Sequence, residues 1–257
     1  MKKPFSKGTA VAVGIGLISV LSLYHLGLFD ASRMLFAVKN LAQFGGELFP
    51  PRWDILPTLI RAVWETVQIS FTGTIVGFLI SLPLAFLGSR VLFPRAVYGT
   101  VRMVIGMIRT VPSILFGIIF VIAFGLGPAA GTLGVAFYTV GYLAKIFYEA
   151  FEAVDKEVIE AIRSTGCNRA QLFRFAILPE AANTIISQLL FMFEYNIRAS
   201  TIMGFVGAGG IGYYMVGYVQ MLQYQNLMTT LILTFFVIMV IDYLSFRIRS
   251  RIAVQKH

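Results

Sequence analysis

A glycine-rich stretch (GFVGAGGIGYY, residues 204–214) contains Gly207, Gly209 and Gly212 in the spacing G-x-G-x-x-G. This spacing is typical of loops that bind dinucleotides, where glycine lets the backbone approach the phosphates. Such a loop follows a β-strand and has an acidic residue about 20 residues further on. Here an apolar stretch comes first, and the next acidic residue is Asp242. We therefore exclude a dinucleotide site and predict that Gly207, Gly209 and Gly210 form a helix break or re-entrant turn.

Two ionisable residues, Glu194 and Arg198, lie inside the apolar stretch that precedes these glycines. A charge at membrane depth costs a few kcal/mol, so both side chains are expected to face protein or water. Their i,i+4 spacing, with the acid first, favours an intrahelical ion pair that neutralises both charges. The alternative is that Arg198 helps an anion to cross, because its forked donors can engage two oxygens at once. The neighbouring polar side chains that belong to the same candidate path are Tyr195, Asn196, Ser200 and Thr201.

The composition indicates a membrane protein with several spans. Of the 257 residues, 58% are hydrophobic and only 13% are charged, whereas a soluble domain carries about 25% charged residues. The single cysteine, Cys167, excludes an internal disulfide, and no cysteine or histidine cluster indicates a metal site. No G-x-x-x-x-G-K-[ST] motif and no nucleophile–base pair is present, so we expect neither ATP hydrolysis nor another enzyme activity from this chain.

The predicted fold class is all-α, a polytopic transmembrane helical bundle. Lipid offers the backbone no hydrogen-bond partners, and apolar stretches near 20 residues therefore span it as helices. We expect residues 1–60 to form a membrane helix and an extracytoplasmic segment, and residues 61–250 to form the transmembrane core. The six predicted spans are Ala10–Phe29, Val67–Leu87, Val111–Leu126, Gly131–Tyr148, Ile185–Phe205 and Leu227–Phe246.

The distribution of basic residues predicts the orientation. With the N-terminus inside, the cytoplasmic segments hold sixteen lysines and arginines and the outer segments hold four. Cytoplasmic loops carry this excess in membrane proteins, so both termini are expected in the cytoplasm. The net charge of +9 is thereby explained as a topology signal, and we do not expect nucleic-acid binding.

A polar segment at about residues 149–182 is expected to form two short helices on the cytoplasmic surface. Asp155 is placed to cap the first helix and Gly166 to end it in a left-handed conformation. Asn168 and Gln171 resemble a capping box that opens the second helix, and Pro179 is expected to prevent its simple continuation. The segment is either a folded loop without a partner or a docking element that fits a groove on a soluble subunit.

Several motifs in the chain carry a family resemblance. Glu160, Ala161, Gly166, Leu178 and Pro179 resemble the EAA loop of ABC-importer permeases, with isoleucine at 162 in place of the second alanine and alanine at 176 in place of isoleucine. The stretches EAVD (152–155), RTVPSILFGIIFV (109–121) and EYNIRASTIMGFVGAGGIG (194–212) are similar to the phosphonate-type permeases. The resemblance covers about residues 58–247.

This resemblance implies a type I ABC-importer permease in the bacterial cytoplasmic (inner) membrane. It implies a homodimeric pore, a cytoplasmic ABC ATPase dimer that holds ATP and Mg, an extracytoplasmic substrate-binding protein, and no cofactor on this chain. The EAA-loop residues would meet the ATPase, and the glycine turn would lie beside the translocation path as a gate or pore lining. The alternative is that the glycines serve only close helix packing. The expected substrate is phosphonate or a related oxyanion such as phosphite or phosphate. The alternative function is a stand-alone secondary carrier or channel for a small anion.

Other charged residues are expected to have local roles. Arg102 and Arg109 lie seven residues apart on one helix face, and we expect them to anchor the helix at the membrane interface or to contact lipid head groups. The alternative is a role in the translocation path. Glu65 is expected to form a solvated pair with Arg61. Asp242 is expected to pair with a neighbouring arginine.

Overall fold

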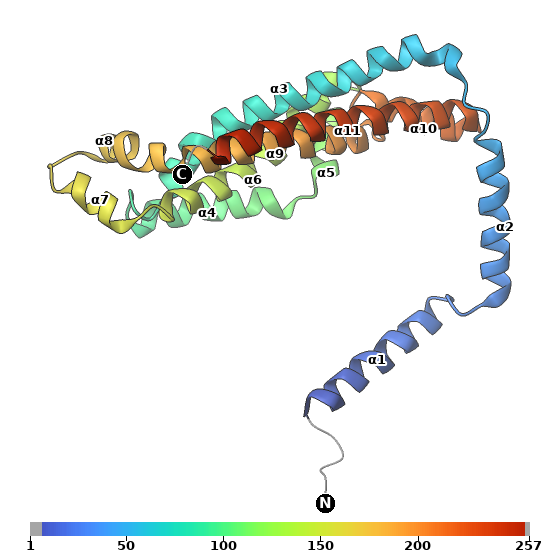
Figure 1. Cartoon of the computed structure of the whole chain (residues 1–257), viewed down its shortest axis with the longest axis horizontal. Helices are drawn as coiled ribbons and strands as arrows, with labels where there is room; N and C mark the ends of the chain where they lie inside the picture. Colours follow the sequence, from blue (N-terminus) through green and yellow to red (C-terminus); the bar gives the residue numbers. More distant parts are fainter. Residues whose placement is uncertain (1–6, 255–257) are drawn as a thin grey trace, which may run out of the picture. The chain divides into compact units, whose positions relative to one another are not determined.

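The structure is a computed structural model, and it describes residues 7–254. The chain divides into two compact units, Met1–Pro51 and Arg52–His257. The first unit contains α1 (Lys7–His25) and α2 (Ala31–Glu47). The helices of the second unit are η1 (Trp53–Ile55), α3 (Leu56–Gly88), α4 (Arg95–Thr110), α5 (Ser113–Phe124), α6 (Pro128–Glu152), α7 (Lys156–Arg163), α8 (Arg169–Leu172), η2 (Phe173–Ile177), α9 (Leu178–Gly204), α10 (Ile211–Gln220) and α11 (Tyr224–Val254) (Figure 1).

Four helices among the described residues are long and apolar enough to cross a membrane, and a bent pair of helices gives a fifth crossing if it counts as one. These four are Trp53–Gly88, Pro128–Glu152, Arg169–Gly204 and Tyr224–Arg251. The first predicted span, Ala10–Phe29, corresponds to α1, whose apolar part Val11–His25 is shorter than the usual length of about 20 residues. The all-helical prediction is confirmed for the described residues, whereas six spans are not.

The bent pair changes the third predicted span. Of residues 111–126, only the 12 residues of α5 are helical, which is too short for a span, and α5 passes as a candidate only together with α4, from which it is bent by 87°. Pro112 has an extended backbone and precedes the first residue of α5. Proline disfavours the helical conformation for the residue before it, and Val111 is accordingly extended. The chain therefore turns sharply here, and α5 itself has only 12 residues.

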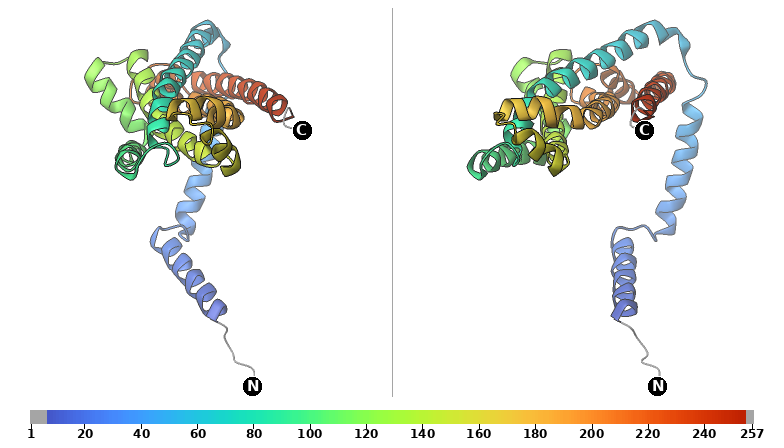
Figure 2. Two further views of the ribbon diagram at one scale, coloured as in Figure 1. Left: turned by 90° about the vertical axis from the view of Figure 1, so that its left-hand side faces the viewer. Right: turned by 60° about the vertical axis from the view of Figure 1, so that its left-hand side comes forward.

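The centre of the second unit is α6, which packs against α3, α4, α5 and α9. Its contact with α3 is close because glycines lie at the crossing. A Cβ atom on Gly73 would lie 2.9 Å from the carbonyl oxygen of Thr132, and one on Gly77 would lie 2.9 Å from that of Ala136. Small residues at four-residue spacing allow this approach between helices that lack a hydrophobic driving force in lipid. Figure 2 shows α11, in red, projecting at one side of this arrangement.

The segment between α6 and α9 follows the predicted caps. The Asp155 side chain accepts a hydrogen bond from the N–H of Glu157, and Asn168 and Gln171 form the expected capping box. Gly166 has φ +76°, so the chain leaves α7 through a left-handed residue as predicted. The predicted bend at Gly166 is therefore confirmed.

Pro179 does not end the second helix, but as predicted the helix does not continue as a simple α-helix. The helix continues from α8 through the π-helical turn η2 into α9, and Pro179 lies in the first turn of α9. In the π-helical turn, the N–H of Leu178 bonds to the carbonyl of Phe173, five residues earlier. This wider turn relieves the clash that proline causes in a regular helix, and the first helical turn does not need the missing N–H.

Candidate functional site

The polar residues of α9 lie on two different faces of that helix. Asn196 and Ser200 are four residues apart and both are buried, whereas Arg198, between them, is exposed. Residues two apart in a helix point in nearly opposite directions, since each residue turns the helix by about 100°. The candidate path residues predicted from the sequence therefore divide into an inner and an outer set.

The inner set forms a buried hydrogen-bond network between α3, α6 and α9. The Asn196 amide donates to the hydroxyl oxygens of Thr74 on α3 and Thr139 on α6, each at 2.8 Å. The Ser70 hydroxyl lies 2.8 Å from the Ser200 hydroxyl. These side chains contact neighbouring helices of the same chain, and buried polar groups that are paired in this way specify how the helices pack. Asn196 and Ser200 therefore face the interior of the bundle.

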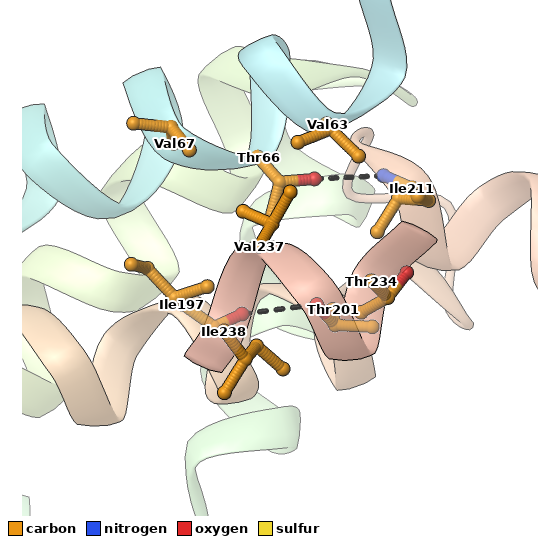
Figure 3. A pocket seen from close by; sticks show the side chains of 9 residues that line it. All are labelled: Val63, Thr66, Val67, Ile197, Thr201, Ile211, Thr234, Val237 and Ile238. Carbon is orange, nitrogen blue, oxygen red and sulfur yellow. Dashed lines mark hydrogen bonds between the residues drawn. The ribbon is translucent and has the colours of Figure 1, made fainter. Parts of the chain in front are cut away.

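Two more residues of the candidate path also contact neighbouring helices. The Tyr195 ring stacks on that of Tyr138, with 5.5 Å between ring centroids. The Thr201 hydroxyl bonds to the carbonyl of Ile197 and lines a cavity of only about 10 Å³ between α3, α9, α10 and α11 (Figure 3). This cavity is otherwise lined by aliphatic side chains and by Thr66 and Thr234, and it is too small for an anion.

The outer set consists of Glu194 and Arg198, and the predicted ion pair between them is wrong. Each residue pairs instead with α11: Arg198 Nη2 lies 2.5 Å from Asp242 Oδ2, and Arg249 Nη2 lies 2.8 Å from Glu194 Oε2. The prediction that Asp242 pairs with an arginine is confirmed. The reason is that α11 packs against α9 and places one charge of the opposite sign beside each of them. The Arg198–Asp242 pair is open, with side-chain exposures of 45% and 37%.

The glycine-rich stretch forms a tight turn between α9 and α10. Gly207, Gly209 and Gly210 have φ values of +86°, +83° and +73°, which side chains with a Cβ rarely adopt. The carbonyl of Gly207 accepts a hydrogen bond of 2.9 Å from the N–H of Gly127, the residue before α6. A Cβ on Gly212 would lie 1.8 Å from the carbonyl oxygen of Thr201. The predicted helix break is confirmed, and the glycines allow close backbone contact with α6 and α9.

The turn is fixed to α3 by two side chains. Glu65 Oε1 accepts a hydrogen bond of 2.8 Å from the N–H of Gly210. The Thr66 hydroxyl accepts one of 2.8 Å from the N–H of Ile211, which Figure 3 shows. Glu65 thus binds the start of α10, where a carboxylate is favourable. The sequence predicted a solvated pair of Glu65 with Arg61 and missed this contact, because it joins residues 145 positions apart.

A recess of about 220 Å³ opens beside the glycine turn. It has polar and apolar walls, formed by the Glu65 carboxylate, the glycine backbone and aromatic rings. Its lining residues are Glu65, Leu126, Gly127, Gly207, Gly209, Gly210, Tyr213 and Tyr214. The three predicted glycines of the candidate path therefore come together at one recess, at the end of α9 distant from the α7–α8 segment.

The α7–α8 segment has one buried and one exposed side. Ile159, Leu172 and Ala176 belong to the core that also contains residues of α3 and α6. Glu160, Ala161, Gly166 and Pro179 are exposed, and Leu178 is half-buried. Val158 and Phe175 expose 37% and 64% of their surface. The segment is thus anchored to the bundle on one side and presents charged and apolar groups on the other.

A charged cluster near this segment was missed from the sequence. Glu152, the last residue of α6, forms ion pairs with Arg90 and Arg102, and its side chain is only 10% exposed. The sequence predicts Arg102 at the membrane interface, whereas the structure pairs its guanidinium with the Glu152 carboxylate. No local pattern signals this cluster, because Lys156 offers Glu152 a base at helical spacing and the actual partners lie 62 and 50 positions away.

Comparisons with known proteins agree with the geometry. Residues 73–253 match the family described as "Binding-protein-dependent transport system inner membrane component". The phosphite transport system permease protein PtxC of Stutzerimonas stutzeri is 35% identical over 236 residues, which are 91% of this chain and 86% of that protein. The phosphate-import permease protein PhnE of Mycolicibacterium smegmatis is 36% identical over 207 residues, 80% of this chain and 39% of that protein.

Solved structures show the same fold. A chain of the MetNI methionine ABC transporter in an inward-facing conformation superimposes with a TM-score of 0.68 at 24% sequence identity. The superposition covers 78% of this chain and 99% of that one. These comparisons agree with the helical fold and with the anchored segment between α6 and α9. The chain therefore belongs to the binding-protein-dependent transport system inner membrane components, and it is the permease subunit of an ABC importer rather than an enzyme.

Proposed function

We propose that this permease forms the translocation path for a small phosphorus oxyanion, such as phosphite, phosphonate or phosphate. The relatives named for phosphite and phosphate transport support this substrate class. The observation that carries the proposal is Arg198, whose guanidinium is exposed inside a membrane-spanning helix and already binds an oxyanion, the Asp242 carboxylate. A phosphorus oxyanion offers the same pair of oxygens to the forked donors of arginine.

The exposure of this pair supports a role in the path. Charged groups in a span are rare on a lipid-facing surface and usually face protein or water. With side-chain exposures of 45% and 37%, Arg198 and Asp242 are not covered by the rest of this chain. We propose that a second copy of the chain faces this side of α9 and α11, and that the water-filled path runs between the two copies. The recess beside Gly207, Gly209 and Gly210 would form its gate at the C-terminal end of α9, which lies six residues beyond Arg198.

The remaining parts of the importer follow from the family. We propose a homodimer in the bacterial cytoplasmic membrane, with α1 as a further span and both chain termini in the cytoplasm. The α7–α8 segment would dock on a cytoplasmic ABC ATPase dimer, which would hold the ATP and Mg. An extracytoplasmic binding protein would deliver the substrate to the glycine-turn end.

The substrate path is tested by substituting Arg198 in the importer assembled with its ATPase and binding protein. Arg198→Ala should abolish uptake while the subunits still assemble. Arg198→Lys should retain part of the uptake, because lysine keeps the positive charge but lacks the two parallel donors of the guanidinium. Uptake is measured with phosphite and phosphate in proteoliposomes. Unchanged uptake by Arg198→Ala would show that the arginine is structural only. Calorimetry of the binding protein with a panel of phosphorus oxyanions then identifies the substrate.

The docking segment is tested separately. Glu160→Lys and Gly166→Pro should abolish uptake and weaken co-purification with the ATPase, while membrane insertion stays intact. Glu157→Gln is the matched control, since Glu157 is an exposed acid of the same helix outside the EAA-like residues. Normal uptake by both variants would contradict docking at this segment, and uptake by the chain alone in liposomes would favour a stand-alone carrier.

A further inference from the structure

Glu152 closes α6 and binds the turn between α3 and α4. Its Oε1 accepts a hydrogen bond of 2.8 Å from the backbone N–H of Arg90, and its Oε2 lies 3.2 Å from Arg90 Nε. The Arg102 guanidinium of α4 forms a second ion pair with Oε1. One carboxylate therefore holds three elements together: the end of α6, the α3–α4 turn and α4.

The Arg102 side chain has further contacts besides Glu152 that fix its position. Its Nε donates a hydrogen bond of 2.8 Å to the carbonyl of Gly88, the last residue of α3. Its guanidinium lies 4.2 Å from the centre of the Tyr148 ring and 5.0 Å from that of Tyr98. A planar guanidinium suits this position because it can stack on rings and donate from its edge at the same time. The cluster is thus specific in geometry as well as in charge.

The same turn is attached to the α7–α8 segment. Arg163 Nη2 of α7 donates a hydrogen bond of 3.2 Å to the carbonyl of Val91. The Phe173 ring of η2 contacts the Phe86 ring of α3 and the Phe151 ring of α6, with centroids 5.0 and 5.1 Å apart. Direct contacts therefore connect α7 to the α3–α4 turn, and η2 to α3 and α6.

We propose that Glu152 is a positioning residue for energy coupling: it locks α3, α4 and α6 together so that movement of the α7–α8 segment tilts them as one body. This inference rests on the proposed docking of that segment on the ATPase. Glu152 is three residues before Asp155, the cap of α7, and therefore lies at the junction between α6 and α7. Without the carboxylate, Arg90 and Arg102 lose their common partner, and the α3–α4 turn is attached less firmly to the end of α6.

A matched control lies one turn earlier on α6. Glu149 is also an acid near the end of this helix, and its ion pair with Lys145, at 2.9 Å, stays within the helix. The Glu149 side chain is 48% exposed, compared with 10% for Glu152. Glu149→Gln therefore removes the same charge from the same end of α6 without separating α3, α4 and α6.

The experiment compares Glu152→Gln and Glu149→Gln in the importer reconstituted with its ATPase and binding protein, with phosphite and phosphate as probes. Uptake and ATP hydrolysis are measured together. Coupling free energies between sites correspond to about 5–150-fold effects, so Glu152→Gln should lower uptake per ATP hydrolysed by about fivefold or more. The ATPase should co-purify with both variants in normal amounts, and Glu149→Gln should resemble the wild type.

The single cysteine gives a second readout. Cys167 is half-buried between α7 and α8, so its alkylation rate reports how firmly the segment is held. Alkylation followed by mass spectrometry of the Cys167 peptide should be faster in Glu152→Gln than in the wild type or Glu149→Gln. If the Glu152→Gln protein does not insert into the membrane, Arg102→Lys provides a milder variant. Lysine keeps a positive charge beside Glu152 but lacks the planar guanidinium that stacks on Tyr98 and Tyr148.

The outcomes separate this inference from the proposed docking. Lower uptake per ATP with normal ATPase association and faster Cys167 alkylation supports a positioning role. Wild-type uptake per ATP in Glu152→Gln overturns the inference and leaves the docking proposal intact. A loss of ATPase association in Glu152→Gln also overturns it, because Glu152 would then act on docking itself. If Glu160→Lys keeps normal ATPase association, the docking proposal fails instead.

Discussion

Arg198 of α9 pairs with Asp242 of α11 at 2.5 Å, although Glu194 lies one turn away on its own helix. Glu194 in turn pairs with Arg249 of α11 at 2.8 Å. Two ion pairs therefore join α9 to α11, and each crosses between helices. The two pairs differ in burial, since the Glu194 side chain is 12% exposed and that of Asp242 is 37% exposed. This difference predicts different energetic roles.

Neutralising Glu194 should destabilise the permease more than neutralising Asp242. Glu194→Gln leaves Arg249 without a charged partner in a mostly buried place and should cost about 1–3 kcal/mol. Asp242→Asn removes a more exposed pair, which is worth about 1 kcal/mol or less. Thermal unfolding midpoints of the purified importer check the order. A larger loss for Asp242→Asn would contradict the assignment of the open pair to a water-filled path.

Removing the buried amide of α9 should loosen the bundle. Asn196→Ala deletes the donors to Thr74 and Thr139 and leaves a small cavity between α3, α6 and α9. A buried polar group that loses its partner costs about 1–3 kcal/mol. Asn183→Ala, on the same helix but only half-buried, is the control. Equal thermal midpoints for the two variants would show that the network contributes little.

Glycines 212 and 217 of α10 should respond differently to alanine. A Cβ on Gly212 would lie 1.8 Å from the carbonyl oxygen of Thr201, whereas one on Gly217 meets nothing within 4 Å. Gly212→Ala forces backbone movement and should cost about 3 kcal/mol, the upper end of overpacking effects. Gly217→Ala should be neutral or slightly stabilising, because alanine favours a helix. Expression and thermal unfolding of both variants test the contact.

Gly166 is required by its backbone conformation and not by space. It has φ +76°, and a Cβ there would meet nothing within 4 Å. Gly166→Ala should therefore destabilise the α7–α8 bend by about 1–2 kcal/mol. Gly166→Asn should cost less, since asparagine tolerates left-handed φ values. Uptake and Cys167 alkylation should follow the same order, and equal effects of alanine and asparagine would point to a steric role.

Local features of the structure could be read directly from the sequence. The caps at Asp155 and Asn168, the left-handed end at Gly166 and the break at Gly207–Gly210 involve residues within a few positions of each other. Interactions over so short a distance depend on local residue types and spacing, and they form wherever the chain permits. The apolar stretches likewise predicted α3, α6, α9 and α11 as spanning helices, since lipid leaves the backbone no other partners.

Only the tertiary structure decided which groups meet. The sequence placed Glu194 beside Arg198, yet packing of α11 against α9 supplied each with a partner more than 40 residues away. The sequence did not predict that Asn196 faces the interior and Arg198 the exterior of the bundle, because α9 carries polar residues on both faces. Glu152 gained its role only when α6 brought it to Arg90 and Arg102. Periodicity fixes which residues share a helix face, but the neighbours of that face depend on how the whole chain packs.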